Sequence, residues 1–282
     1  MKVTPLFAQR RQSLVHSLWA LPFLLVFSPT LLFLWEKWTK NVWLNGHGVF
    51  VPILVAFLAH FALTHRSFED EEPSPWGFAF LGAGLFLVAY DSAIKTEILS
   101  AVALIVCLPG LSLLLLGPQR TRALLFPWLL SFFMLPLPAF ALDRIHMALR
   151  LITVYGTAPV LDLFGIPHVV SGTTIEIPRG PVQVVDLCSG FSALYAATTI
   201  ALVLIYMADT NRRRVILALL PFPLAMLFNI VRVTGMVLLC HYQGFQILDT
   251  WIHTFLGWVC FLGTLVVLFT FADDAAPSEV RA

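Results

Sequence analysis

The sequence predicts an all-α polytopic membrane protein with about eight transmembrane helices and a small extracytoplasmic β-hairpin before the sixth helix. Hydrophobic residues make up 59% of the 282-residue chain and charged residues only 12%, whereas soluble domains carry about 25% charged residues. Apolar windows of about 20 residues, long enough to span a bilayer, recur along the chain. Between the fifth and sixth windows the pattern changes to two-residue alternation, which is typical of a hairpin.

The apolar windows define the predicted spans in chain order. They lie at residues 17–35, 48–65, 75–92, 98–117, 123–142, 190–207, 215–240 and 254–271. The first apolar run is too long for a signal-peptide core and no small-residue cleavage site follows it, so we interpret it as an uncleaved span. Prolines within the windows, including Pro136 and Pro138, are expected to kink or interrupt some spans. A short amphipathic helix is expected after the fifth span.

Lys and Arg residues in short loops predict the orientation in the membrane. The strongest signal is the run Arg212, Arg213 and Arg214 after the sixth span. With an even number of spans, both termini are cytoplasmic in the inner (cytoplasmic) cell membrane, and the loop after the fifth span is periplasmic. We expect one integral membrane domain over 1–282, made of four parts. These are five spans over 1–142, an outer amphipathic helix and hairpin over 143–187, a catalytic three-helix part over 188–271 and a cytoplasmic tail over 272–282.

Composition also excludes several function classes. A net charge of +1 argues against nucleic acid as a partner, and the lipid bilayer is the expected environment. Four cysteines are too few and too scattered for a disulfide framework or a metal site, so no metal and no cofactor are expected. Cys107, Cys240 and Cys260 lie within apolar runs and are interpreted as inert buried thiols.

Cys188 stands apart from the other cysteines because it lies at the outer N-terminal end of the sixth span. Unpaired backbone N–H groups and the helix dipole favour an anion there, which predicts a stabilised thiolate. Asp186 or Ser189 is expected to cap the helix, and Gly190 to let another chain approach closely. The predicted hairpin, with its turn at residues 178–181, delivers the chain to this point.

Arg232 lies within an apolar run, where a charge is costly and is usually paired or functional. It follows Arg214 by 18 residues, or about 27 Å of helix, which places it near the outer boundary of the bilayer. Asn229 lies on the same helix face. The alternative interpretation is that the long side chain of Arg232 only places its guanidinium in the outer membrane–water interface.

His253 lies at the outer start of the last span, and a histidine can act as a general base or acid near neutral pH. A membrane-interface role beside Trp251 is the alternative. His241 is a rival base at the outer end of the seventh span, and His146 and His168 in the preceding outer segment are weaker candidates. Three separate helices thus bring a thiol, a guanidinium and an imidazole to one depth. A Cys–His pair performs nucleophilic acyl transfer, and an arginine can stabilise the thiolate or the oxyanion.

At these residues the sequence resembles the exosortase/archaeosortase family of membrane cysteine transpeptidases. The matching segments are CSG at 188–190, NIVR at 229–232, His253 with Gly257, and FGIP at 164–167. The resemblance covers residues 165–260, and the first five spans match only in hydrophobicity.

The resemblance implies that Cys188, Arg232 and His253 are catalytic, with Asn229, Ser189, Gly190 and Asp186 as supporting residues. It implies substrates that are secreted proteins with a C-terminal anchor of the PEP-CTERM kind: a short signature, one membrane helix and a basic cluster. The enzyme would cut near the signature on the outer face. It would pass the acyl group through a thioester on Cys188 to an acceptor amine, in a system linked to surface-protein sorting and extracellular polysaccharide.

Two alternatives use the same residues differently. In a non-enzymatic membrane subunit of a polysaccharide export or assembly system, Arg232 and the histidines would line a pathway or a subunit contact. In a membrane acyltransferase that uses histidine alone, Cys188 would be incidental. The clustering of polar groups at one depth argues against a channel or transporter, which needs them at several depths.

Overall fold

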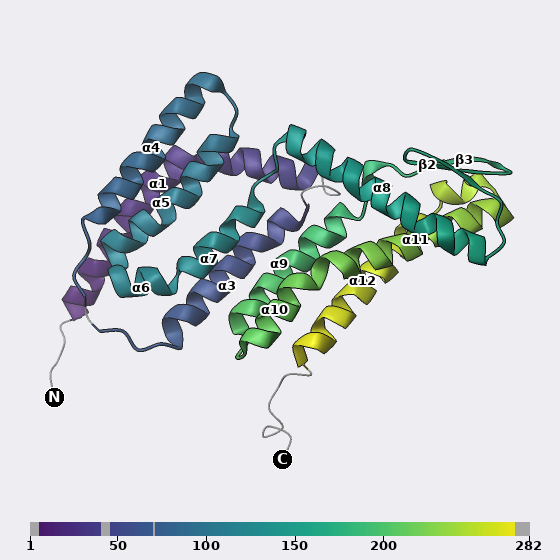
Figure 1. Cartoon of the computed structure of the whole chain (residues 1–282). Helices are drawn as coiled ribbons and strands as arrows, with labels where there is room; N and C mark the ends of the chain where they lie inside the picture. Colours follow the sequence, from purple (N-terminus) through teal and green to yellow (C-terminus); the bar gives the residue numbers. More distant parts are fainter. Residues whose placement is uncertain (1–5, 41–45, 70, 274–282) are drawn as a thin grey trace, which may run out of the picture. The chain divides into compact units, whose positions relative to one another are not determined.

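The computed structural model describes residues 6–40, 46–69 and 71–273 and divides the chain into two compact units, Met1–Pro136 and Leu137–Ala282. Figure 1 shows the helices and strands of both units, coloured along the sequence from purple at the N-terminus to yellow at the C-terminus. Most of the predicted cytoplasmic tail over 272–282 lies outside the described residues, as do residues 1–5 ahead of the first predicted span.

The first unit is helical. Its elements are α1 (Leu6–Lys40), the 3-10 helix η1 (Gly46–Val49), α3 (Phe50–Thr64), α4 (Trp76–Ile94), α5 (Ile98–Leu116), α6 (Pro118–Ala123), α7 (Leu125–Leu130) and the 3-10 helix η2 (Ser131–Met134). The helices α4 and α5 pack side by side along their length. Small residues permit this close approach, because a methyl group added at Gly77 would lie 2.5 Å from the carbonyl oxygen of Gly110.

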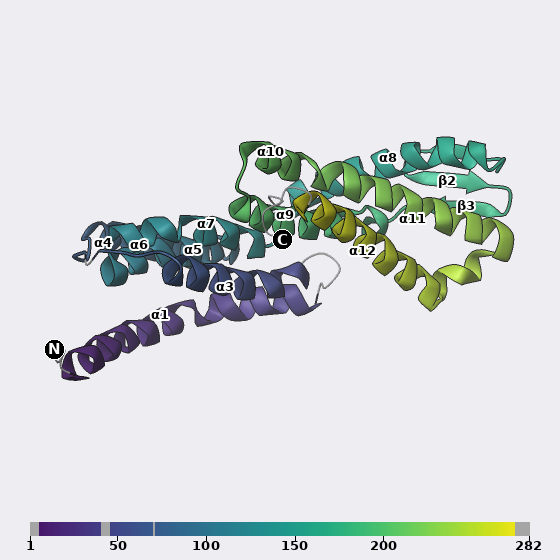
Figure 2. The same cartoon turned by 90° about the horizontal axis from the view of Figure 1, so that it is seen from below.

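The second unit contains all of the predicted site residues. Its elements are α8 (Ala139–Leu163), β1 (Val169–Ser171), β2 (Thr174–Ile177), β3 (Gly180–Gln183), the 3-10 helix η3 (Asp186–Cys188), α9 (Phe191–Met207), α10 (Asn211–Leu219), α11 (Pro221–Gln243), the 3-10 helix η4 (Phe245–Asp249) and α12 (Trp251–Asp273). Helix α11 packs against α8, α9 and α12, so it is the central helix of this unit (Figure 2).

The predicted hairpin is present, but a third strand joins it. The strands form an antiparallel sheet in the order β1-β2-β3, with Ile175 opposite both Val170 and Val182. Along β2, Ile175 and Ile177 are buried while Glu176 between them is exposed, which is the alternation that the sequence predicts. The strand β1 was not predicted, because its three residues are too few to display a period.

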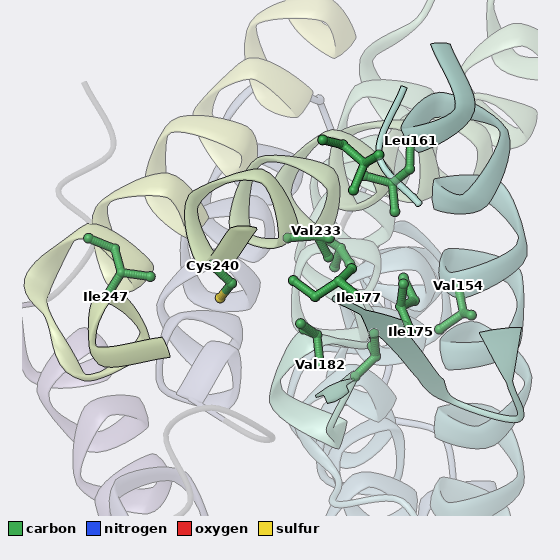
Figure 3. Close-up of a cluster of buried hydrophobic side chains, with 11 residues drawn as sticks. Val154, Leu161, Ile175, Ile177, Val182, Val233, Cys240 and Ile247 are labelled. Atoms are coloured by element: carbon green, nitrogen blue, oxygen red, sulfur yellow. The ribbon is translucent and has the colours of Figure 1, made fainter. Parts of the chain in front are cut away.

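One face of the sheet completes a hydrophobic core with the helices of the second unit. Figure 3 shows Ile175, Ile177 and Val182 facing Val154 of α8 and Val233 of α11. The cluster extends along α11 to Cys240 and into η4 at Ile247. This packing fixes the sheet against α8 and α11, and β3 leads directly into the turn that carries Cys188.

Several apolar helices make the chain a multi-pass membrane protein, but the predicted count of eight spans is not confirmed. Four described helices are long and apolar enough to cross a membrane, or up to five if a bent helix pair counts as one span. The four are Trp76–Ile94, Ile98–Leu116, Asn211–Gln243 and Trp251–Ala272. The apolar helices α3 and α9 have 15 and 17 residues and are shorter than these four.

The predicted span over 123–142 is wrong as a continuous helix. In the structure α7 and η2 end at Met134, and α8 begins at Ala139. Pro136 and Pro138 lie in this break, since proline lacks a backbone donor and disfavours helical geometry in the residue before it. The amphipathic helix expected after the fifth span is α8, which has 25 residues and is not short.

Candidate active site

Cys188 lies in a tight turn between the sheet and α9. It is the last residue of η3, and its backbone N–H donates to the carbonyl of Val185. Gly190 follows with a left-handed φ of 82° and is the N-cap of α9. A methyl group added there would lie 2.9 Å from Cγ of Asn229. Gly190 therefore provides both the turn and the close approach of α11 that the sequence predicts.

The structure brings Cys188, Arg232 and His253 together from three elements, η3, α11 and α12. The Sγ atom of Cys188 lies 3.5 Å from Nε2 of His253, and an Nη2 atom of Arg232 lies 3.3 Å from the same Nε2. All three side chains are partly buried. The imidazole thus lies between the thiol and the guanidinium.

The contact with Arg232 identifies the protonation state of His253 in this arrangement. A guanidinium only donates hydrogen bonds, so Nε2 of His253 must accept the bond from Nη2 of Arg232. The neutral ring then carries its proton on Nδ1, and its Nε2, whose single lone pair accepts from Arg232, also lies within hydrogen-bond distance of the Cys188 thiol. This tautomer is the one that can take a proton from Sγ.

The resting thiol is less acidic than the sequence predicts. Burial raises the pKa of Cys188 above its ordinary value, and the Arg232 guanidinium acts in the opposite direction. The expected stabilisation by the N-terminus of the sixth span is not dominant, because Cys188 precedes α9 by a separate turn and is largely removed from water. Burial of Cys188 therefore favours the neutral form of its thiol.

Asn229 holds the main chain of the nucleophile. Its Nδ2 donates to the carbonyl oxygen of Cys188 at 2.9 Å and to Oγ1 of Thr153 on α8, also at 2.9 Å. Both Asn229 and Thr153 are buried. Because an unpaired polar group is costly in such surroundings, this bridge fixes Cys188 relative to α8 and α11.

Asp186 and Ser189 flank Cys188 and are held by α8, but neither caps α9 through its side chain in the expected way. Asp186 pairs with Arg150 at 3.2 Å. Ser189 Oγ lies 2.8 Å from Nδ1 of His146 and accepts a bond from the backbone N–H of Phe191. The N-cap position itself is taken by Gly190.

The rival histidines have other surroundings. The His241 ring packs edge-on against Tyr242, and Nδ1 of His168 faces the carbonyl of Ile166 at 3.0 Å. Within the described residues, neither ring has a hydrogen bond to Cys188. His146 contacts Ser189 instead of the thiol.

Sequence reasoning missed Arg150 and Thr153, which contact the site from α8. Together with His146 they follow the spacing i, i+4, i+7, which places them on one helix face. This spacing was visible in the sequence, but the partners of these residues lie 36 to 76 positions away and no local pattern identifies them. The remaining three cysteines, Cys107, Cys240 and Cys260, are buried as predicted.

A small, partly buried site of this kind, on a multi-pass membrane protein, has the groups of a cysteine-dependent acyl-transfer enzyme. The chain matches the protein family described as transmembrane exosortase (Exosortase_EpsH) over residues 35–270. The match covers well over half of the chain, so this protein belongs to the exosortase family. Comparison with curated proteins and with solved structures gives no match.

Proposed function

We propose that this protein is a membrane-embedded cysteine protease and transpeptidase that cleaves the C-terminal sorting signal of secreted proteins. The observation that carries the proposal is the contact of one imidazole nitrogen, Nε2 of His253, with both Sγ of Cys188 and Nη2 of Arg232. A thiol, a base and a fixed positive charge within hydrogen-bond reach are the groups that acyl transfer requires.

In the first half-reaction, Nε2 of His253 takes the proton of the Cys188 thiol as Sγ attacks the carbonyl carbon of the scissile peptide bond. The C–N bond then breaks, and the leaving amine takes the proton back from Nε2. The products are a thioester on Cys188 and the released anchor segment. When Nε2 takes the proton it can no longer accept from Arg232, and the released guanidinium N–H stabilises the thiolate and the developing oxyanion charge.

In the second half-reaction, an acceptor amine attacks the thioester carbon and gives a proton to His253. The C–S bond breaks, a new amide forms, and the thiolate regains the proton as the thiol. Water in place of the amine would give hydrolysis with the same residues. The acceptor is therefore the reactant that separates a transpeptidase from a protease.

We further propose the PEP-CTERM-like anchor as substrate and the outer, periplasmic face of the cell membrane as the location of the site. The family membership supports this class of substrate. A substrate whose own membrane helix lies in the same bilayer is confined to two dimensions, which raises its effective concentration at the site.

The non-enzymatic alternative, a membrane subunit of a polysaccharide export or assembly system, does not explain the contact of a thiol with an imidazole. A subunit contact needs neither a nucleophile nor a base. This alternative predicts that a secreted reporter with a C-terminal anchor stays unprocessed even in cells that contain the wild-type protein.

The experiment is processing of a secreted reporter with a C-terminal anchor, in cells that contain wild-type protein or a single variant. Cys188→Ala, Arg232→Ala and His253→Ala are each expected to remain in the membrane and to abolish processing. Cys107→Ala is the matched control, since it removes a buried thiol of the first unit and is expected to retain processing. Processing by Cys188→Ala at the wild-type rate would refute the proposal and favour an enzyme that uses histidine alone.

A further inference from the structure

We infer that one face of α8, formed by His146, Arg150 and Thr153, positions the nucleophile, and that His146 is the positioning residue whose hydrogen bond to Ser189 keeps Cys188 within reach of His253. This inference rests on the proposed function for its chemistry. It assigns to His146 a role different from that of a general base.

The three residues occupy positions i, i+4 and i+7 of α8; two of them contact the turn directly and the third acts on it through Asn229. His146 contacts Ser189 at 2.8 Å, directly after the nucleophile, and Arg150 pairs with Asp186 at 3.2 Å, two residues before it. Thr153 accepts from Asn229, which in turn holds the carbonyl of Cys188. The turn is thereby held on both sides of Cys188 and at its own main chain.

Burial makes the His146–Ser189 bond a stronger restraint than the Arg150–Asp186 pair, and the Thr153–Asn229 bond is buried to a similar degree. His146 is 3% exposed and Ser189 is 0% exposed, so water cannot replace either partner when the bond is broken. The carboxylate of Asp186, in contrast, belongs to a side chain that is 55% exposed, and an exposed ion pair contributes little.

The same geometry argues against His146 as a base in the reaction. Its Nδ1 faces Ser189, and its Nε2 is buried without a hydrogen-bond partner within the described residues. Ser189 itself is fully buried and also accepts from the N–H of Phe191, so it cannot reach a substrate. His146 thus acts through Ser189 on the position of Cys188.

The restraint matters because the proposed proton transfer takes place across the 3.5 Å contact between Sγ of Cys188 and Nε2 of His253. A displacement of 1 Å at a reacting atom can cost about a hundredfold in rate. Ser189 is the neighbour of Cys188 in the chain, so a shift of Ser189 moves the nucleophile with it.

The test compares two isosteric changes at one position. In His146→Asn the side-chain amide can occupy the place of Nδ1 and keep the bond to Ser189, whereas in His146→Gln it occupies the place of Nε2 and loses the bond. We expect kcat to fall about tenfold or more in His146→Gln with KM nearly unchanged, and His146→Asn to retain most of the wild-type kcat. Equal loss in both variants would overturn the inference, because it would indicate that the imidazole itself is required. Wild-type kcat in both would overturn it as well.

A second variant and a second readout keep the test decisive. If the His146 variants do not accumulate in the membrane, Ser189→Ala removes the same bond from the other side and is expected to lower kcat without raising KM. An unchanged kcat in Ser189→Ala would refute the inference.

If wild-type protein shows no turnover, the proposed function fails, but the rate of Cys188 alkylation by iodoacetamide against pH still tests whether His146 positions Cys188. The profile is then expected to shift in His146→Gln and to coincide with wild type in His146→Asn. If the pH profiles of wild type, His146→Asn and His146→Gln coincide, the inference that His146 positions Cys188 is refuted.

Discussion

At the scale of single residues, Arg232 acts on both the imidazole of His253 and the thiol of Cys188. Its guanidinium donates to Nε2 of His253 and so selects the tautomer that can accept the thiol proton. The same charge lowers the pKa of Cys188 against the opposing effect of burial. A single arginine within a span thus contributes a hydrogen bond and a long-range charge, which explains why the chain tolerates the cost of placing it there.

The effect of Arg232 on the thiol gives a prediction with a definite sign. Arg232→Gln removes a positive charge that favours the thiolate, so the pKa of Cys188 rises further and the alkylation profile moves to higher pH. The measurement is the iodoacetamide rate against pH, with Cys188→Ala as the blank. Arg144→Gln is the control, because it removes an exposed arginine of α8. A shift to lower pH in Arg232→Gln would contradict this role.

Gly257 provides space for the Arg232 side chain. A methyl group added at Gly257 would lie 3.4 Å from Cζ and Nε of Arg232, which is ordinary contact. Gly257→Ala is therefore expected to retain most activity, whereas Gly257→Leu is expected to displace the guanidinium and lower kcat by about tenfold or more. Kinetics of the two variants at equal protein in the membrane test this. Equal activity in both would show that the space is not needed.

At the scale of elements, the sheet is fixed through its buried face, and this packing determines where the turn of Cys188 begins. Ile175 is 0% exposed within the core cluster, whereas Val169 of β1 is 64% exposed. Ile175→Ala is expected to destabilise the protein by about 2–5 kcal/mol, and the matched truncation Val169→Ala by about 0.5 kcal/mol or less. Thermal unfolding in detergent compares the two, and similar melting temperatures would contradict the packing described here.

The sequence predicted the elements whose signal is local. The alternation of Ile175 and Ile177 identified β2, and the apolar runs located α4, α5 and α12 to within a few residues. The span over 123–142 failed because hydrophobicity alone hides the breaks that Pro136 and Pro138 introduce. Hydrophobicity also does not fix the length of a helix: the apolar run at 190–207 gives α9 with 17 residues, whereas α12 has 23.

The residues of the candidate site also divide into those that have a local signal in the sequence and those that do not. Cys188, Arg232 and His253 could be selected from the sequence because each is a costly or reactive group within or beside an apolar run. Arg150 and Thr153 could not, since their partners are distant in the chain and only the packing of α8 beside the turn connects them. The acidity of the thiol was misjudged for a related reason: burial is a property of the folded unit and does not appear in a sequence pattern.

At the scale of the whole molecule, the chain is a multi-pass membrane protein of the exosortase family. The orientation remains a prediction from the distribution of basic residues, of which Arg212, Arg213 and Arg214 are the strongest group. They lie at the start of α10, where Thr210 accepts a bond from the N–H of Arg213.

Replacing all three arginines with glutamine is expected to disturb insertion while leaving the chemistry of correctly inserted molecules intact. The reason is that basic loop residues set topology and none of the three contacts Cys188, Arg232 or His253 within the described residues. Accessibility labelling of a cysteine placed in the loop before α10 measures orientation, and reporter processing measures activity. Unchanged topology with lost turnover would contradict the topological role.

The central claim is that Cys188 carries the acyl group, and mass spectrometry tests it most directly. Purified protein is incubated with an anchor peptide, digested, and searched for a peptide adduct on the fragment that contains Cys188. The account predicts an adduct that hydroxylamine removes, that is absent from Cys188→Ala and that accumulates when no acceptor amine is supplied. Cleavage of the peptide without any adduct on Cys188, and with full activity in Cys188→Ala, would contradict it.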